Sequence, residues 1–166
     1  MNVDLTLYTN IKNSGIDLIL SVPCIMLKGL LEIIDFKNEI QHIYVTREEE
    51  GVGIAAGAYL GGKSPAILMQ NSGLGNSVNA IKSLLELYRI PITFILSHRG
   101  AKGEKILAQK PMGQITEKLL EILSIKTYIL DSTGKFNNIK KAVNYSKENK
   151  KSAAILLKKS LWGELS

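Results

Sequence analysis

Cysteine and long apolar runs are the scarcest features of this sequence of 166 residues. The single cysteine, Cys24, excludes an internal disulfide and a cysteine-based zinc site, and it indicates a reducing compartment. No apolar run approaches the roughly 20 residues that span a bilayer. The first residues also lack the basic and then apolar pattern of a secretory signal. We therefore expect a cytoplasmic protein with no membrane partner.

Nucleic-acid-binding motifs are absent as well, although the net charge is +6. Aromatic residues make up 6% of the chain, and none forms a stacking platform among the basic residues. The lysines of 147–151 alternate with polar residues, which is typical of a solvated helix face. We therefore expect no nucleic-acid partner.

The apolar segments predict the fold. The chain is 45% hydrophobic, which suits one domain over residues 1–166. Short Ile/Val/Leu runs alternate with stretches of helical periodicity, a pattern that predicts an α/β fold with a doubly wound, mostly parallel six-stranded sheet and helices on both faces. The expected strands are Leu18–Val22, His42–Thr46, Ala66–Gln70, Ile92–Ser97, Thr127–Leu130 and Ala153–Leu157. The expected helices span 3–14, 25–36, 47–60, 76–89, 115–124 and 135–148.

Ligands of such sheets bind beyond the carboxyl ends of the strands, so the loops there are the candidate sites. The first is the acidic run Glu48, Glu49 and Glu50, which opens a helix without charged residues from Gly51 to Gly62. Acids in a first turn are favoured by the helix dipole, and Thr46 with Glu49 fits a capping box. A helix that is apolar all round is expected to be buried, and a buried carboxylate needs a partner. The run therefore predicts a functional carboxylate, with the choice among the three open.

The second candidate is the polar turn from Gln70 to Ser77, where Asn71, Ser72 and Gly73 allow close approach of a ligand to the backbone. An ordinary turn with Asn76 or Ser77 as the helix N-cap is the competing interpretation. Neither a dinucleotide fingerprint nor a phosphate-binding P-loop is present.

The third candidate follows the strand that ends at Ser97. His98 and Arg99 come directly off this buried strand, and the planar fork of arginine suits an anionic substrate. Lys102 and Lys105 are expected to be exposed. Pro23 and Cys24 end an earlier strand, where Cys24 is either a buried thiol or a substrate contact, and His42 is expected to be structural.

These stretches, in this order, resemble the pyrimidine-binding domain of thiamine diphosphate enzymes, in the branch of the sulfopyruvate and phosphonopyruvate decarboxylases. The resemblance runs through five segments and covers nearly the whole chain. They are 21–24 with Leu27 and Lys28, 46–51, 69–79, 97–100, and 111–113 with Thr116. The run Gln-Asn-Ser-Gly-Leu-Gly-Asn is the segment most specific to this branch.

The resemblance implies thiamine diphosphate as cofactor and an anionic 2-oxoacid as substrate. It assigns Glu48 as the catalytic acid at the aminopyrimidine ring, with Glu49 as the alternative because Gly51 comes three positions after Glu48. It further implies cofactor contacts from Glu48, Asn71, Ser72 and Gly73. The implied substrate contacts are Pro23, Cys24, Asn71, His98 and Arg99.

Family members bind diphosphate and Mg²⁺ through a Gly-Asp-Gly motif, which this sequence lacks. The resemblance therefore implies no metal ligand in this chain and a partner, the beta subunit, that carries the motif and holds Mg²⁺. Two alternatives stay open: a basic α/β binding module, and an assembly subunit without catalysis. Sulfopyruvate and phosphonopyruvate are not distinguished by these residues.

Overall fold

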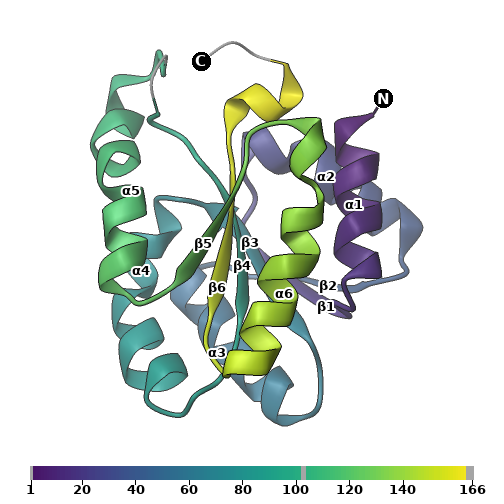
Figure 1. Cartoon of the computed structure of the whole chain (residues 1–166), viewed down its shortest axis with the longest axis vertical. Coiled ribbons are helices and arrows are strands. Elements are labelled where there is room, and N and C mark those ends of the chain that lie inside the picture. The colour runs from purple at the N-terminus through teal and green to yellow at the C-terminus, as the bar shows by residue number, and fades with distance from the viewer. Residues whose placement is uncertain (1, 102–103, 164–166) are drawn as a thin grey trace.

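A computed structural model describes residues 2–101 and 104–163, which form one sheet with helices on both faces (Figure 1). The strands are β1 (Leu18–Ser21), β2 (Gln41–Tyr44), β3 (Pro65–Gln70), β4 (Thr93–Ser97), β5 (Lys126–Leu130) and β6 (Ala153–Leu157). They lie in the order β2-β1-β3-β4-β6-β5, and every pair is parallel. The predicted α/β class is confirmed, with a sheet that is entirely rather than mostly parallel.

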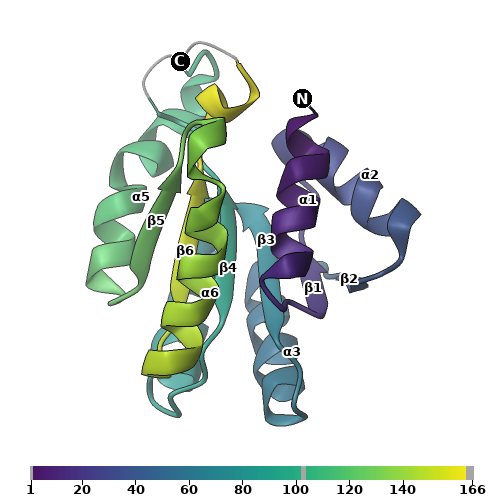
Figure 2. The same ribbon diagram turned by 45° about the vertical axis from the view of Figure 1, so that its right-hand side comes forward.

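Alternate side chains of the four central strands, β1, β3, β4 and β6, enter two separate apolar cores. The helices are α1 (Val3–Asn13), α2 (Lys28–Lys37), α3 (Glu48–Leu60), α4 (Gly73–Ala80), α5 (Lys110–Ile122) and α6 (Asn137–Asn149). Ile19 of β1 belongs to the core that includes side chains of α1, α2 and α6, whereas Leu20 belongs to the core that includes side chains of α3, α4 and α5. Figure 2 shows α1 and α6 side by side on the first face. Burial on both faces explains the continuous Ile/Val/Leu runs of the central strands.

Two helices begin earlier than the sequence predicts. The helix expected from residue 76 begins at Gly73, so neither Asn76 nor Ser77 is its N-cap, and it continues into a π-helical segment, Ile81–Glu86. The helix expected from residue 115 begins at Lys110, because Pro111 is tolerated in a first turn where its missing N–H has no helical partner. The first turn of the helix expected over 25–36 is a 3₁₀ segment, Ile25–Leu27.

Other expectations concern exposure. None of the helices in the described residues is both long and apolar enough to cross a bilayer. Lys105 is exposed, as predicted, whereas Lys102 lies outside the described residues.

His42 is structural, as expected: its Nε2 lies 2.8 Å from the Ser21 hydroxyl, and its Nδ1 lies 2.6 Å from Asp35 Oδ1.

Candidate functional site

The candidate site lies where β1 and β3 leave the sheet. From β1 the chain proceeds to one neighbour, β2, and then returns to the other side of β1 as β3. Loops that leave adjacent strands in opposite directions open a crevice at the carboxyl edge of a parallel sheet. Pro23 and Cys24 follow β1 at this edge, Asn71 and Ser72 follow β3, and the acidic first turn of α3 follows β2.

Each glutamate of that first turn has a different environment. Glu50 caps the helix: its Oε2 accepts hydrogen bonds from the Thr46 backbone N–H at 2.9 Å and the Thr46 hydroxyl at 2.7 Å. These bonds lower the pKa of Glu50. The predicted capping box between Thr46 and Glu49 is therefore wrong. Arg47 is the N-cap, and the glutamate that accepts hydrogen bonds from Thr46 is Glu50.

Glu48 connects the first turns of α3 and α4. Its Oε2 accepts a hydrogen bond of 2.9 Å from Asn76 Nδ2, and its side chain lies against Gly73. A Cβ at Gly73 would come within 2.3 Å of Glu48 Cγ, so this contact requires glycine. The sequence predicted close approach of a ligand at Gly73. In this structure the group that lies there is the Glu48 side chain, and the predicted ligand contact stays a prediction.

Glu49 has one carboxylate oxygen that no hydrogen bond stabilises within the described residues. Its Oε1 lies 2.6 Å from Arg47 Nε, but its Oε2 is buried and has no hydrogen-bond partner among the described residues. A buried carboxylate oxygen without a donor is costly, so such an atom marks a place where a ligand with a hydrogen-bonding group is stabilised.

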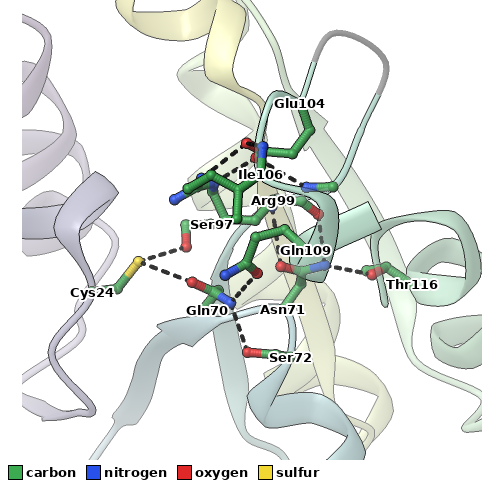
Figure 3. A network of polar contacts seen from close by, with 11 residues as sticks. Cys24, Gln70, Asn71, Ser72, Ser97, Arg99, Glu104, Ile106, Gln109 and Thr116 are labelled. Carbon is green, nitrogen blue, oxygen red and sulfur yellow. Dashed lines mark hydrogen bonds and ion pairs between the residues drawn. The ribbon is translucent and has the colours of Figure 1, made fainter. Parts of the chain in front are cut away.

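A chain of polar contacts lies at the carboxyl ends of β1, β3 and β4 (Figure 3). Gln70 Nε2 donates to the Ser72 hydroxyl and to Gln109 Oε1, both at 2.8 Å. Cys24 Sγ lies 3.2 Å from the Ser97 hydroxyl and 3.9 Å from Gln70 Oε1. The contacts join β1, β3, β4 and the turn before α5. Sequence reasoning missed Gln109 and Ser97, whose roles depend on contacts between distant segments.

Asn71 is a buried clamp between two loops. Its Nδ2 donates to the Arg99 carbonyl at 3.0 Å and to the Thr116 hydroxyl at 2.7 Å, and its Oδ1 accepts from the Arg99 backbone N–H at 3.0 Å. Both N–H groups of the amide are thus engaged within the chain. The predicted contact of Asn71 with cofactor or substrate stays a prediction, and the structure gives Asn71 a positioning role.

Arg99 directs its fork to Glu104 rather than into the crevice. Arg99 Nε and Nη2 donate to the two carboxylate oxygens of Glu104 at 2.7 and 3.1 Å, and both side chains are largely buried. These hydrogen bonds, first among several causes, lower the pKa of Glu104 to about 2. The fork predicted to bind a substrate anion therefore already holds an internal carboxylate, which sequence reasoning missed.

His98 is buried with both ring nitrogens engaged. Nε2 lies 3.1 Å from the Gly113 carbonyl, and Nδ1 lies 2.7 Å from Lys158 Nζ. Because the carbonyl only accepts and the ammonium only donates, the ring is neutral with its proton on Nε2. Burial, the largest cause, lowers the pKa of His98. The ring thus joins β6 to the first turns of α5, and its predicted substrate contact stays a prediction.

Pro23 and Cys24 line an open pocket of about 380 Å³ at the end of β1. Its walls are mainly apolar, and Lys28 supplies a cation whose partner Glu32 lies 3.7 Å away in an exposed pair. Within the described residues, no group of three or more His, Cys, Asp or Glu side chains is placed to hold a metal ion.

Comparison with known proteins identifies the family. Residues 1–120 match the model of the "Thiamine pyrophosphate enzyme, N-terminal TPP binding domain". The "Sulfopyruvate decarboxylase subunit alpha" of Methanococcus maripaludis is 50% identical over 98% of each chain. Its counterpart in Methanothermobacter thermautotrophicus is 49% identical, over 93% of this chain and 94% of the relative. The chain belongs to the sulfopyruvate decarboxylase alpha-subunit family. The resemblance described in the sequence analysis is thus confirmed.

A longer protein and a solved structure are also similar to this chain. A longer "Sulfopyruvate decarboxylase" of Methanosarcina acetivorans is 36% identical over 91% of this chain, which spans 38% of that relative. A solved 2-oxoglutarate:ferredoxin oxidoreductase from Magnetococcus marinus has a TM-score of 0.74 at 11% identity, over 96% of this chain and 29% of that one. The latter likeness shows a shared fold.

Proposed function

We propose that this chain is the alpha subunit of a thiamine diphosphate-dependent decarboxylase that converts 3-sulfopyruvate to sulfoacetaldehyde and carbon dioxide in coenzyme M biosynthesis. The identity of about half the residues with alpha subunits of sulfopyruvate decarboxylases, over nearly the whole of both chains, carries the proposal. Phosphonopyruvate decarboxylases are more distant: the Streptomyces viridochromogenes protein is 38% identical over 72% of this chain. This difference favours the sulfonate over the phosphonate substrate.

Glu49 is the proposed catalytic acid at the pyrimidine ring. Its buried Oε2 has no partner among the described residues, whereas Glu48 is bound by Asn76 and Glu50 by Thr46. A protonated ring nitrogen or amine would supply the donor that Oε2 lacks. Glu48, to which the resemblance assigned this role, is then the residue that fixes the first turn of α3 against α4.

The remaining site residues fit the pyrimidine end of the cofactor and the substrate. Ser72 and Gly73 are the proposed cofactor contacts, and Pro23 and Cys24 are the proposed substrate contacts. Asn71, His98 and Arg99 act by positioning the loops, because their side chains are engaged within the chain. When bound, thiamine diphosphate supplies the electron sink that lets carbon dioxide leave a 2-oxoacid.

A partner beta subunit completes the proposed site. Relatives named as subunit alpha imply a second subunit, and this sequence has no Gly-Asp-Gly motif to hold diphosphate and Mg²⁺. The longer Methanosarcina relative supports this arrangement, because more than half of it lies outside the match to this chain. The cytoplasm is the proposed location of the complex.

The experiment is decarboxylation by the assembled complex. This chain, co-expressed with a chain that bears Gly-Asp-Gly, is expected to release carbon dioxide from 3-sulfopyruvate with thiamine diphosphate and Mg²⁺, and more slowly from phosphonopyruvate. No release from any 2-oxoacid by an assembled complex that binds the cofactor would refute the proposal.

Glutamine replacements then separate the three glutamates. Glu49→Gln is expected to lower carbon dioxide release at least about 100-fold with assembly intact, a typical loss for an acid–base group. Glu48→Gln is the matched control, because its amide oxygen still accepts from Asn76, and Glu50→Gln tests the cap. Full activity of Glu49→Gln with loss in Glu48→Gln would restore the assignment to Glu48.

A further inference from the structure

A second hollow lies at the opposite end of the sheet from the candidate site, where the chain enters β4, β5 and β6. The C-terminal end of α6, which contributes to it, is at the lower end of Figure 1. The cavity has a volume of about 370 Å³ and lies among the turns that enter β4, β5 and β6. The side chains of Ile81, Leu85, Leu123 and Ile125 form an apolar wall. A cavity of this size, part apolar and part polar, has the character of a small-molecule site.

Cations dominate the polar part of the wall. Arg89, Lys150 and Lys151 all line the cavity, whereas the carboxylate of Glu86 is paired with Lys82. Lys150 Nζ donates to the Tyr59 hydroxyl at 2.9 Å. In the part of the chain that the structure describes, the Arg89 guanidinium and the Lys151 ammonium have no ion-pair partner.

The charges exceed what the helix ends require. Three helical segments end beside the cavity, and each C-terminus carries about half a negative charge, or roughly 1.5 in total. Three cations therefore leave a surplus of roughly 1.5 positive charges beside an apolar wall. Neutralisation of helix dipoles accounts for only part of this charge. All three cations are exposed at the cavity, so an anion that enters it would meet positive charge without an opposite charge on the protein.

The backbone gives independent support. Among the described residues, four that are not glycine have a positive φ, and three of them line this cavity: Arg89 (54°), Ser124 (56°) and Lys150 (52°). Glycine adopts this conformation after a helix without steric cost. Side chains are thus kept at three converging turns where glycine would be less strained, which is typical of functional sites.

We propose that this cavity binds a small organic anion, with an oxyanion head at Arg89 and Lys151 and an apolar body on Ile81 and Leu85. The guanidinium fork suits the paired oxygens of a phosphate or sulfonate, and Ser124 and Ser152 supply hydroxyl groups. The site is separate from the crevice at β1 and β3, so the inference does not depend on the proposed decarboxylation.

Phenyl phosphate is a suitable probe, because inorganic phosphate and phenol represent its two halves. Titration of the isotope-labelled full chain, followed by two-dimensional NMR, is expected to shift resonances of 81–89, 123–125 and 149–152 saturably. The affinity for phenyl phosphate is expected to exceed that for either half at least tenfold. Equal binding of phenol would refute an anion site, and no saturable shift at these positions would refute any ligand here.

Glycine variants separate binding from stability. Arg89→Gly is expected to weaken binding of phenyl phosphate about tenfold, with a melting temperature that is unchanged or higher, because the positive φ is relieved. Asn38→Gly is the matched control, since Asn38 has the same conformation (φ 48°) outside this cavity. Unchanged binding in Arg89→Gly, or equal weakening in Asn38→Gly, would overturn the proposal.

Discussion

Glu104, in the loop after β4, has a strongly lowered pKa. Its carboxylate accepts hydrogen bonds from the Arg99 guanidinium and from the backbone N–H groups of Gly100 and Ile106. These contacts hold the pKa of Glu104 at about 2, against a reference value of 4.5. A carboxylate with a lowered pKa stabilises the folded state where it is ionised in both states, that is, above the reference value.

Replacement of Glu104 by glutamine is therefore expected to have a pH-dependent cost. At pH 7 the variant should lose on the order of 2 kcal/mol in the free energy of unfolding. The difference from the native chain should shrink as the pH falls below 4.5 and vanish only below the folded pKa of about 2. Urea unfolding between pH 7 and pH 3 measures it, with Asp131→Asn, which removes an exposed pair, as the control. A difference that does not vary with pH would contradict this account.

Most of the residue roles could be predicted only to the level of the loop. The sequence placed Glu48, Asn71 and Arg99 at the correct edge of the sheet, because the ends of parallel strands converge there. It could not assign their contacts, since the partner of Arg99, Glu104, is a loop residue with no periodic signal. The choice between Glu48 and Glu49 likewise depends on Asn76, which is 28 residues from Glu48 in the chain.

At the scale of elements, the loop after β4 and the first turn of α5 cross in direct backbone contact. A Cβ on Gly113 would lie 2.2 Å from the Gly100 carbonyl carbon, and one on Gly100 would lie 1.9 Å from the Gln109 carbonyl oxygen. Neither backbone can move independently, because Gly113 O is also bound to His98 Nε2. The close contact of the two segments therefore depends on glycine at both positions.

Gly113→Ala is accordingly expected to destabilise the fold by about 2–3 kcal/mol, because overpacking against backbone is not relieved by a rotamer change. Gly53→Ala is the matched control: a Cβ there meets no atom within 4 Å, and alanine favours the helix by about 0.5–1 kcal/mol. Urea unfolding of both variants tests the contrast. A Gly113→Ala variant as stable as the native chain would show that the crossing is loose.

Element types were predictable, whereas several helix starts were not. The six apolar runs identified all strands of the described sheet, since burial on both faces leaves a continuous signal. The start of α4 at Gly73 was missed because Asn76 resembles an N-cap, although its amide instead binds Glu48 of another helix. The start of α5 was missed because Pro111 usually breaks a helix, although proline is tolerated in the first turn, where it lies here.

At the scale of the whole molecule, α3 corrects one expectation and exposes an apolar face. The sequence predicted burial on every side, but only one face, with Gly51, Val52, Ala55 and Ala56, is buried within this chain. On the other face Ile54 is 38% exposed and Leu60 is 74% exposed, and Gly53 and Gly57 have open space above them. An apolar helix face lined by small residues, beside the carboxylates of its first turn, suits close packing of a second chain.

Gly57→Leu tests this face without disturbing the chain itself. A side chain at Gly57 meets no atom within 4 Å, and leucine is the better helix former, so the isolated variant is expected to be at least as stable as the native chain. The added bulk would separate the two packed surfaces, so co-purification with the beta subunit should fall at least tenfold and decarboxylation with it. Gly134→Leu is the control, because that position is equally open and lies near the end of β5. Normal assembly of Gly57→Leu would mean that the beta subunit approaches the crevice from another side.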